Sequence, residues 1–311
     1  MRGSTSRDAP VRSLWQLVDK VERPIEWLIK LCGWSSILGV AAIFVFIFKE
    51  AAPMFGRLDW VEFFTSTRWV PHPAQGNEPQ FGTLALLVGT FSTTGLALLI
   101  AVPMGLAAAI FVSEFAEGKT RETLKIVLEL LAAIPSIVWG FIGLMVLGPI
   151  IQKVTGAPQG TNLLNAGVIL ALMSVPLIVS LSEDALRAVP DTYREAALAL
   201  GANKWEIVYR VLFPAARNGL LAASLLGMGR AIGETMAVLL CTGHNNQIPH
   251  ALTDPVRTVT ATIAAEMGET VQGGDHYRVL FVLGVVLFIL TGAINVIADL
   301  IIKGVKKQNR A

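Results

Sequence analysis

The stretch EAALALGANKWEIVYRVLFP, residues 195–214, decides how this chain is organised. Residues 192–200 favour a short helix, in which Ala196 and Ala197 are small enough to let another surface approach the backbone closely. Gly201 can then adopt the left-handed conformation that ends such a helix. Pro214 suits the first turn of a following helix, where its missing N–H costs little. The segment is predicted to form a helix, a turn, a second short helix and the start of an apolar span.

Around this segment the chain is far more apolar than a soluble domain of its length. Hydrophobic residues make up 53% of the 311 residues, charged residues make up 15%, and the mean hydropathy is +0.60. A membrane span needs roughly 20 apolar residues, because its backbone polar groups must be satisfied internally. Six segments meet this requirement: 31–48, 81–113, 126–151, 163–182, 215–240 and 279–302. The predicted fold class is an all-α integral membrane protein with six transmembrane helices.

Lys and Arg residues are divided unequally between alternate connections. If both termini lie on one side, that side carries seventeen of them and the opposite side carries six, with Lys125 and Arg230 inside spans. Positively charged loops stay in the cytoplasm. Both termini, including the basic segment 303–311, and the connection 186–214 are therefore predicted to be cytoplasmic.

The spacing within 195–214 resembles the EAA loop of ABC importer permeases. In that family Glu-Ala-Ala is followed by three residues and a glycine, then by nine residues and Ile-x-Leu-Pro. Glu195, Ala196, Ala197 and Gly201 stand at the matching positions, and Val-Leu-Phe-Pro at 211–214 departs only by two apolar exchanges. The resemblance implies that the first helix docks in a cleft of a separate ATPase subunit. The alternative is a loop that merely joins two spans, and the full spacing argues against it.

Three further stretches resemble the phosphate-specific transport (Pst) permeases. They are FGTLALLVGTFSTTGLALLIAVPMGLAAAIFVSEF from residue 81, AAIPSIVWGFIG from 132 and GRAIGETMAV from 229. Gly229-Arg230-Ala231 before the Gly-Glu-Thr triplet, and Met236 after it, resemble the PstC type more than its PstA-type partner. The resemblance implies a MetI-like (type I) permease core at 81–302 in the bacterial inner membrane, translocating inorganic phosphate by alternating access.

Further subunits are implied by the same resemblance. One permease forms half of a pore in that family, so a PstA-like permease, two PstB-like ATPases and a PstS-like phosphate-binding protein are expected. ATP and Mg²⁺ would be bound by the ATPases, and no catalytic residue, cofactor or metal is expected in this chain. The net charge of +2 predicts no nucleic-acid partner. The alternatives are a PstA-type subunit, a permease for another oxyanion, a membrane-embedded enzyme, and an ion-coupled secondary transporter, for which we find no internal repeat.

Two charges interrupt the fifth span. Arg230 and Glu234 are four residues apart, so on a continuous helix they would share a face and could pair. An unpaired charge at the bilayer centre costs at least about 2.5 kcal/mol, so we expect these two residues to have a functional or structural role. We predict that both side chains line the substrate path, where Glu234 partly neutralises Arg230 and keeps anion binding releasable. The alternative is a structural ion pair that fixes helix register.

Small residues recur every four positions along the same span. Ala215, Gly219, Ala223, Gly227 and Ala231 form a face on which another helix can pack closely. Mid-span prolines at 103, 135 and 176 each remove a backbone donor and predict kinks.

Outside the core, two flanking segments carry predictions. In the tail 1–30, apolar residues from Val11 to Ile25 recur at helical spacing, which predicts an amphipathic helix on the cytoplasmic membrane surface, or alternatively a soluble docking helix. The segment 49–80 is predicted to be a periplasmic loop. In the loop before the last span, Glu266, Glu269 and Asp275 are candidates for contact with a soluble binding protein.

Several polar residues are expected to carry no special chemistry. The four histidines fall in predicted loops without metal-site spacing, and Cys32 and Cys241 have no partner motif. Residues 113–120 resemble a phosphate-binding loop but lack its first glycine and its α/β context. Glu183 and Asp184 are expected to face the cytoplasmic loop.

Overall fold

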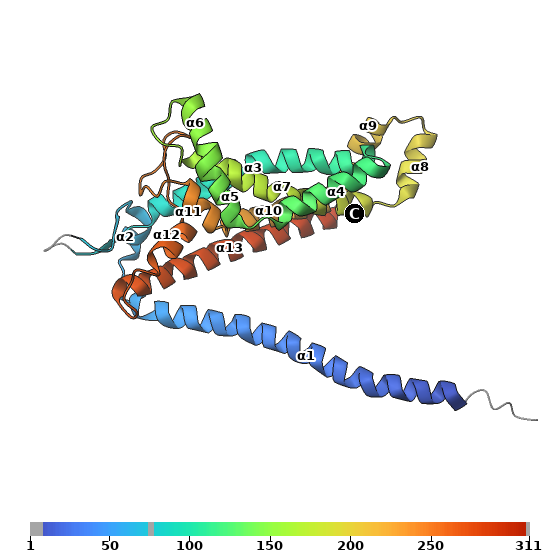
Figure 1. Cartoon of the computed structure of the whole chain (residues 1–311), viewed down its shortest axis with the longest axis horizontal. Coiled ribbons are helices and arrows are strands. Elements are labelled where there is room, and N and C mark those ends of the chain that lie inside the picture. Colours follow the sequence, from blue (N-terminus) through green and yellow to red (C-terminus); the bar gives the residue numbers. More distant parts are fainter. Residues whose placement is uncertain (1–8, 74–77, 309–311) are drawn as a thin grey trace, which may run out of the picture.

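The structure, a computed structural model, describes residues 9–73 and 78–308 of the chain. Within this part, six helical segments are long and apolar enough to cross a membrane: Pro24–Met54, Leu84–Phe115, Ser136–Thr155, Leu163–Arg187, Lys204–Ile232 and Asp275–Ile297. Most of them run lengthwise in an elongated bundle (Figure 1). The six predicted spans are therefore present with shifted bounds, and the shift is largest for the third and the fifth.

The described elements follow one another along the chain in a simple order. They are α1 (Ala9–Ala51), the 3₁₀ turn η1 (Ala52–Met54), α2 (Trp60–Thr65), β1 (Trp69–Val70), β2 (Gln80–Phe81), α3 (Leu84–Ile110), the π turn η2 (Phe111–Phe115), α4 (Gly118–Ala133), α5 (Ser136–Ile142), the π turn η3 (Gly143–Leu147), α6 (Gly148–Thr155), α7 (Leu163–Arg187), α8 (Asp191–Ala199), α9 (Lys204–Ile207), the π turn η4 (Val208–Leu212), α10 (Phe213–Ile232), α11 (Met236–Cys241), α12 (Val259–Glu266) and α13 (Asp275–Gln308). The two short strands pair antiparallel, with Trp69 opposite Phe81.

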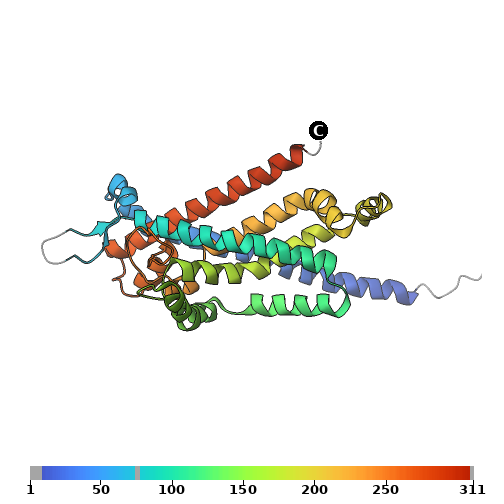
Figure 2. The ribbon, with the colours of Figure 1, turned by 90° about the horizontal axis from the view of Figure 1, so that it is seen from above.

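The bundle has two unlike ends. α8 and α9 lie at one end, where they are yellow in Figures 1 and 2. α2, α6 and α12 lie at the opposite end. We call these the α8 end and the α6 end. The described chain begins and ends towards the α8 end.

α7 is the most enclosed span, with 67% of its apolar window buried. α3 and α10 pack against it through small residues. A Cβ on Gly219 would come within 2.4 Å of the Ala185 Cβ, and one on Gly227 within 2.7 Å of Ile178. Glycine is thus required where the helices touch most closely. The predicted small-residue face is confirmed as a packing face, apart from Ala215, which is exposed.

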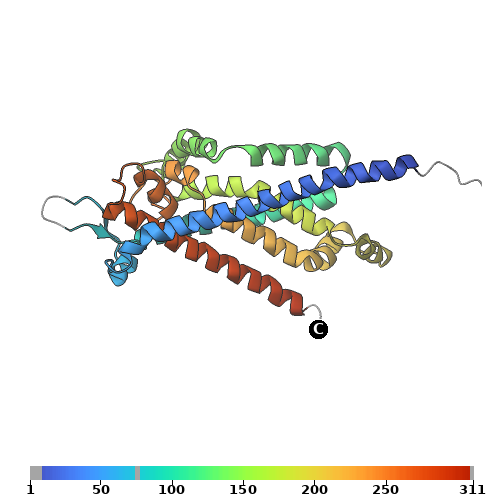
Figure 3. The same cartoon turned by 90° about the horizontal axis from the view of Figure 1, so that it is seen from below.

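α1 is the least enclosed span. None of its apolar window is buried, and it contacts the bundle mainly through α13, where Phe44 meets Phe288 and Phe46 meets Phe281. Figure 1 shows it diverging from the other helices towards its N-terminus, and Figure 3 shows it crossing in front of the bundle and separating from α13. The helix is continuous from Ala9 into the predicted first span. The side chains before residue 24 lie outside the described ones, so the amphipathic surface helix stays a prediction.

The third span does not begin where hydropathy predicts. The segment 126–151 is divided at Pro135: α4 ends at Ala133, and α5 begins at Ser136. Ile134 has an extended ψ of 124°, as expected for a residue that precedes proline. The span is Ser136–Thr155, and α4 is a separate helix without a buried residue.

The fifth span is also divided. α10 ends at Ile232, and α11 begins at Met236, so the segment 215–240 is not one helix. At its other end the helical segment starts at Lys204, earlier than predicted, because α9 and η4 run directly into α10. The break falls at Gly233, Glu234 and Thr235, which places the predicted polar residues at a helix terminus.

Candidate functional site

The predicted helix of the 195–214 segment is present as α8, Asp191–Ala199. Gly201 has a φ of 82°, and its N–H donates to the Leu198 carbonyl at 2.9 Å. The N–H of Ala202 donates to the Ala197 carbonyl at 3.0 Å. These two bonds form a Schellman motif, which satisfies carbonyls at the helix end. The predicted left-handed cap at Gly201 is therefore confirmed.

The second half of the segment follows the sequence-based expectation with one addition. Asn203 and Glu206 form a capping box at the start of α9. A π turn then connects α9 to α10 without a loop. Pro214 lies in the first turn of α10, as predicted.

The residues of α8 divide between an outer and an inner face. Glu195 and Ala196 are exposed, whereas Ala197 is only 7% exposed and packs in a cluster with Val189 and Ile207. The prediction that Ala197 helps a partner approach is therefore corrected, because its small size serves internal packing. Leu200 is 90% exposed. This apolar residue was not singled out by the sequence analysis.

Arg230 and Glu234 do not form the predicted pair. Both are described, yet no ion pair joins them, because the helix ends between them. The carboxylate of Glu234 accepts instead from the N–H groups of Thr235 at 3.1 Å and Ala237 at 3.4 Å, at the start of α11. The backbone carbonyl of Glu234 accepts a hydrogen bond from the Thr260 hydroxyl at 2.7 Å. The i, i+4 spacing predicted a contact that exists only on a continuous helix.

Arg230 lies at a cavity of about 230 Å³ between α4, α7 and α10. Lys125 is the second cation of its lining, and the acidic residues there are Glu129, Glu183 and Asp184. Arg230, Glu129 and Asp184 are themselves exposed, so these cations and carboxylates share an open cavity. Three carboxylates oppose two cations in this lining, and Lys125 is paired with Glu183, so any attraction of an anion here would come from Arg230.

Glu183 is buried, with a side chain 5% exposed, whereas we predicted that it faces the loop. Its Oε1 lies 3.1 Å from Nη2 of Arg121, 3.0 Å from Nζ of Lys125 and 3.4 Å from Nε of Arg187. A buried carboxylate needs such compensation. Two of the partners come from α4, so this cluster attaches α4 to α7.

At the α6 end, Glu266 is the centre of a second buried cluster. Its carboxylate binds Nη2 of Arg257, accepts from the Trp69 indole N–H at 2.9 Å, and lies 2.8 Å from Nε2 of His276. Glu266 therefore joins separate elements of its own chain, and its predicted contact with a binding protein stays a prediction. Glu269 is exposed, and Asp275 pairs at 3.5 Å with Arg57.

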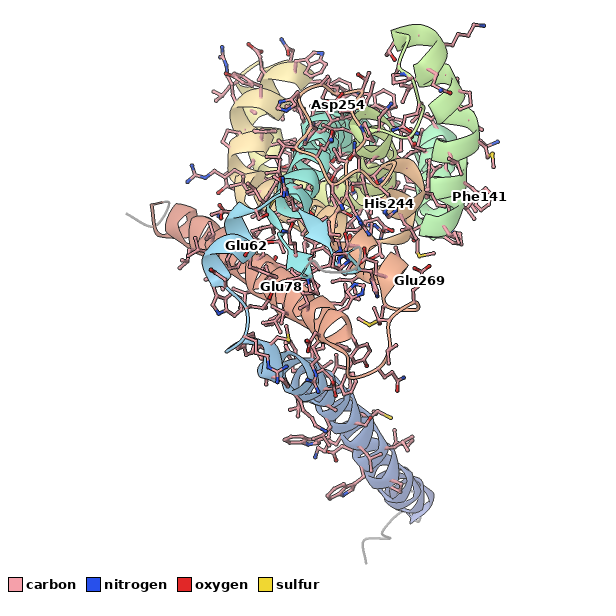
Figure 4. The ribbon with its side chains drawn as sticks, turned by 90° about the vertical axis from the view of Figure 1, so that its left-hand side faces the viewer. Glu62, Glu78, Phe141, His244, Asp254 and Glu269 are labelled. Atoms are coloured by element: carbon pink, nitrogen blue, oxygen red, sulfur yellow. The ribbon has the colours of Figure 1, made fainter. Side chains whose placement is uncertain are left out.

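Two titratable loop residues at the same end have shifted pKa values. Burial, followed by the positive charge of Arg257, lowers the pKa of His244 below its ordinary 6.5. Hydrogen bonds from the N–H groups of His250 and Ala251 lower the pKa of Asp254. Figure 4 looks onto this end and shows His244, Asp254 and Glu269 together with Glu62 and Glu78.

The sequence is similar to transport proteins along most of its length. A family model described as "Binding-protein-dependent transport system inner membrane component" matches residues 101–310. The phosphate transport system permease protein PstC of Mesorhizobium japonicum is 38% identical over 283 residues, covering 84% of this chain and 83% of that protein. The probable ABC transporter permease protein YqgH of Bacillus subtilis is 36% identical over 266 residues, covering 85% of each.

Solved structures share the fold at low sequence identity. A chain of a bacterial ABC transporter that imports alginate is 13% identical with a TM-score of 0.63, covering 94% of this chain and 98% of that one. A chain of the MetNI methionine ABC transporter is 22% identical with a TM-score of 0.54, covering 72% and 94%. The likeness shows the architecture of type I importer permeases.

Proposed function

Since this chain belongs to the family of binding-protein-dependent transport system inner membrane components, and to its PstC-type branch, we propose that it imports inorganic phosphate as one half of an ATP-driven pore. The similarity to PstC proteins over four-fifths of both chains carries the choice of phosphate. The exposed face of α8 supports the mode of action, because it offers a rigid, capped helix to another subunit.

The chain is a multi-pass protein of the inner membrane, and the proposal adds its orientation. Six spans return the chain to the side from which it started. The excess of Lys and Arg on the α8 side favours the cytoplasm for that end, with both termini inside. The α6 end then faces the periplasm, where a substrate-binding protein can reach it.

The remaining subunits are part of the proposal. A PstA-like permease completes the pore, two PstB-like ATPases bind ATP and Mg²⁺, and a PstS-like protein delivers phosphate. This chain then has no catalytic role. Glu195 and Ala196 on the outer face of α8, held by the Gly201 cap, are the residues we assign to the ATPase contact. Closure of the ATPases would move α8 and open the path outward.

Arg230 and Glu234 are proposed to act at separate points of the substrate path. Arg230 provides a cation in the cavity between α4, α7 and α10, where nearby carboxylates keep the attraction weak enough for release. Glu234 lies at the break before α11, and its bonds to Thr235 and Ala237 support that break. Replacing Arg230 by Ala should abolish phosphate uptake at normal expression, and replacing Glu234 by Gln should reduce it. Normal uptake by both variants would remove these residues from the path.

The substrate is tested by uptake of labelled phosphate in cells with and without the chain, with sulfate and molybdate as competitors. We expect uptake that depends on the chain and that neither competitor reduces. Competition by sulfate or molybdate would indicate a permease for another oxyanion. Uptake that persists after deletion of the separate ATPase would indicate an ion-coupled transporter instead.

A further inference from the structure

Arg194, the residue before the Glu-Ala-Ala triplet, connects three helix ends. Its side chain is 19% exposed, and that of Glu114 is 14% exposed. Nη2 of Arg194 donates to Oε1 of Glu114 at 3.1 Å, and Nε donates to Oε2 at 3.4 Å. The two contacts form a bidentate pair, which fixes the relative orientation of the two groups. Glu114 belongs to the π turn η2 at the end of α3.

The same guanidinium also binds the end of α7. It donates to the carbonyls of Leu186 at 3.0 Å and Val189 at 2.9 Å, and to the carboxylate of Asp191 at 3.0 Å. These carbonyls belong to the last turn of α7 and to the link that follows it. Because most donors of Arg194 are used, the charge of a largely buried group is compensated from several directions.

Two other contacts join the α8–α9 unit to the link between α3 and α4. Lys204 pairs with Glu117 at 3.2 Å, and the rings of Phe115 and Trp205 are 4.9 Å apart. The Lys204–Glu117 pair is largely exposed, with side chains 61% and 82% accessible. Exposed pairs contribute little free energy, because solvent screens their charges. The Arg194–Glu114 pair is the enclosed, charge-bearing connection among the three.

We infer that Arg194 and Glu114 are positioning residues that transmit the movement of α8 to the packed pair of α3 and α7. The inference rests on the proposed function, in which α8 receives the movement of the ATPases. α3 and α7 contact each other along their lengths, and α10 packs on both. The guanidinium of Arg194 then carries a displacement of α8 to both central helices, beside the apolar packing of Ala197. Glu114 lies in a π turn, a local geometry that is frequent at functional sites in helices.

The test uses the complete importer carrying Glu114→Gln, reconstituted in liposomes. This change keeps the shape of the side chain and leaves the bonds of Arg194 to α7 in place, so it weakens the link to α3 alone. The readouts are subunit stoichiometry, basal ATP hydrolysis, and the stimulation of hydrolysis by the phosphate-loaded binding protein. The matched control is Lys204→Gln, which removes the exposed pair between the same two segments.

We expect Glu114→Gln to assemble with basal hydrolysis close to that of the wild type. Stimulation by the loaded binding protein and phosphate uptake should fall about tenfold, within the roughly 5- to 150-fold range of couplings between distant sites. Lys204→Gln should retain both. Stimulation and uptake of Glu114→Gln at control levels would overturn the inference.

A second variant guards against failed assembly. Arg194→Lys keeps the positive charge but loses the bidentate geometry, and it should show the same loss of stimulation in a complex of normal stoichiometry. If neither variant assembles, the pair is structural and the inference is wrong. A wild-type importer that phosphate does not stimulate would instead count against the proposed function, so the two failures are distinguishable.

Discussion

The two ends of the bundle hold their buried charges in different ways. At the α6 end, Glu266 binds Trp69 of β1, Arg257 of a loop and His276 of α13, and Asn246 adds a bond to the Trp69 carbonyl. At the α8 end, the α8–α9 unit continues into α10 and packs through Ala197 and Ile207, and its enclosed ion pair is Arg194–Glu114, while the outer face of α8 stays open. At the α6 end the buried cluster thus joins separated parts of the chain, whereas at the α8 end an open helix face is left for the proposed ATPase contact.

The largest effect is expected from disrupting the buried cluster around Glu266. Glu266→Ala leaves Arg257 largely buried without its carboxylate, and removing one partner of a buried pair costs about 3–5 kcal/mol. Thermal unfolding of the purified importer should shift to clearly lower temperature. The control is Glu269→Ala, an exposed neighbour that should leave the unfolding temperature unchanged. Equal unfolding temperatures for both variants would show that the cluster does not hold this end together.

The next effect compares two glycine caps. Gly156 at the end of α6 has a φ of 72°, Gly201 after α8 has a φ of 82°, and a Cβ would meet nothing within 4 Å at either position. Replacement by Ala should cost about 1–2 kcal/mol of local stability in both cases, because the left-handed conformation is strained for other residues. Phosphate uptake measured at equal expression should fall for Gly201→Ala and stay normal for Gly156→Ala. Equal uptake by the two variants would contradict the assigned role of α8.

A smaller effect is expected from pH. The pKa of His244 is lowered in the folded protein, so the unfolded chain binds this proton more readily between the two pKa values. The stability that His244 contributes is therefore complete above pH 6.5 and is lost as the pH falls from there towards the folded-state pKa. Unfolding temperatures measured between pH 7.5 and 5.5, about one unit either side of the ordinary value, should decline less for His244→Gln. A decline identical to that of the wild type would show that His244 does not contribute to the pH dependence of stability.

The smallest effect is expected from exposed pairs at both ends. Arg57 pairs with Asp275 at 3.5 Å at the α6 end, with side chains 65% and 59% accessible, and Lys204 pairs with Glu117 near α8. Replacing Arg57 or Lys204 by Gln should change the unfolding free energy by less than about 1 kcal/mol. Denaturant titration of the two variants would check this. A large loss of unfolding free energy in one variant alone would show that the surface pair at that end stabilises the protein more than its exposure indicates.

Local chemistry allowed α8 to be predicted from sequence, whereas tertiary partners were missed. The helix, the Gly201 cap and the place of Pro214 depend on residues within a few positions of one another. Glu183 and Glu266 could not be placed in this way, because their partners Arg121 and Trp69 lie far away in the chain. Their burial follows from packing that no single segment determines.

The two divided spans show a different limit. Hydropathy averages over a window, so it cannot detect that Pro135 separates α4 from α5 or that α10 ends before Glu234. The proline was a usable signal for the first break. At the second, the spacing of Arg230 and Glu234 predicted a pair only because a continuous helix was assumed. The predicted fold class is nevertheless confirmed, since helix breaks change span boundaries and leave their number unchanged.

The central claim, that α8 is gripped by a separate ATPase subunit, is tested most directly by photo-crosslinking in intact cells. A photoreactive residue at position 196, on the exposed face of α8, should form an adduct with the ATPase subunit, and one at position 269 at the opposite end should not. Absence of an ATPase adduct from position 196, in cells where the importer takes up phosphate normally, would contradict the account.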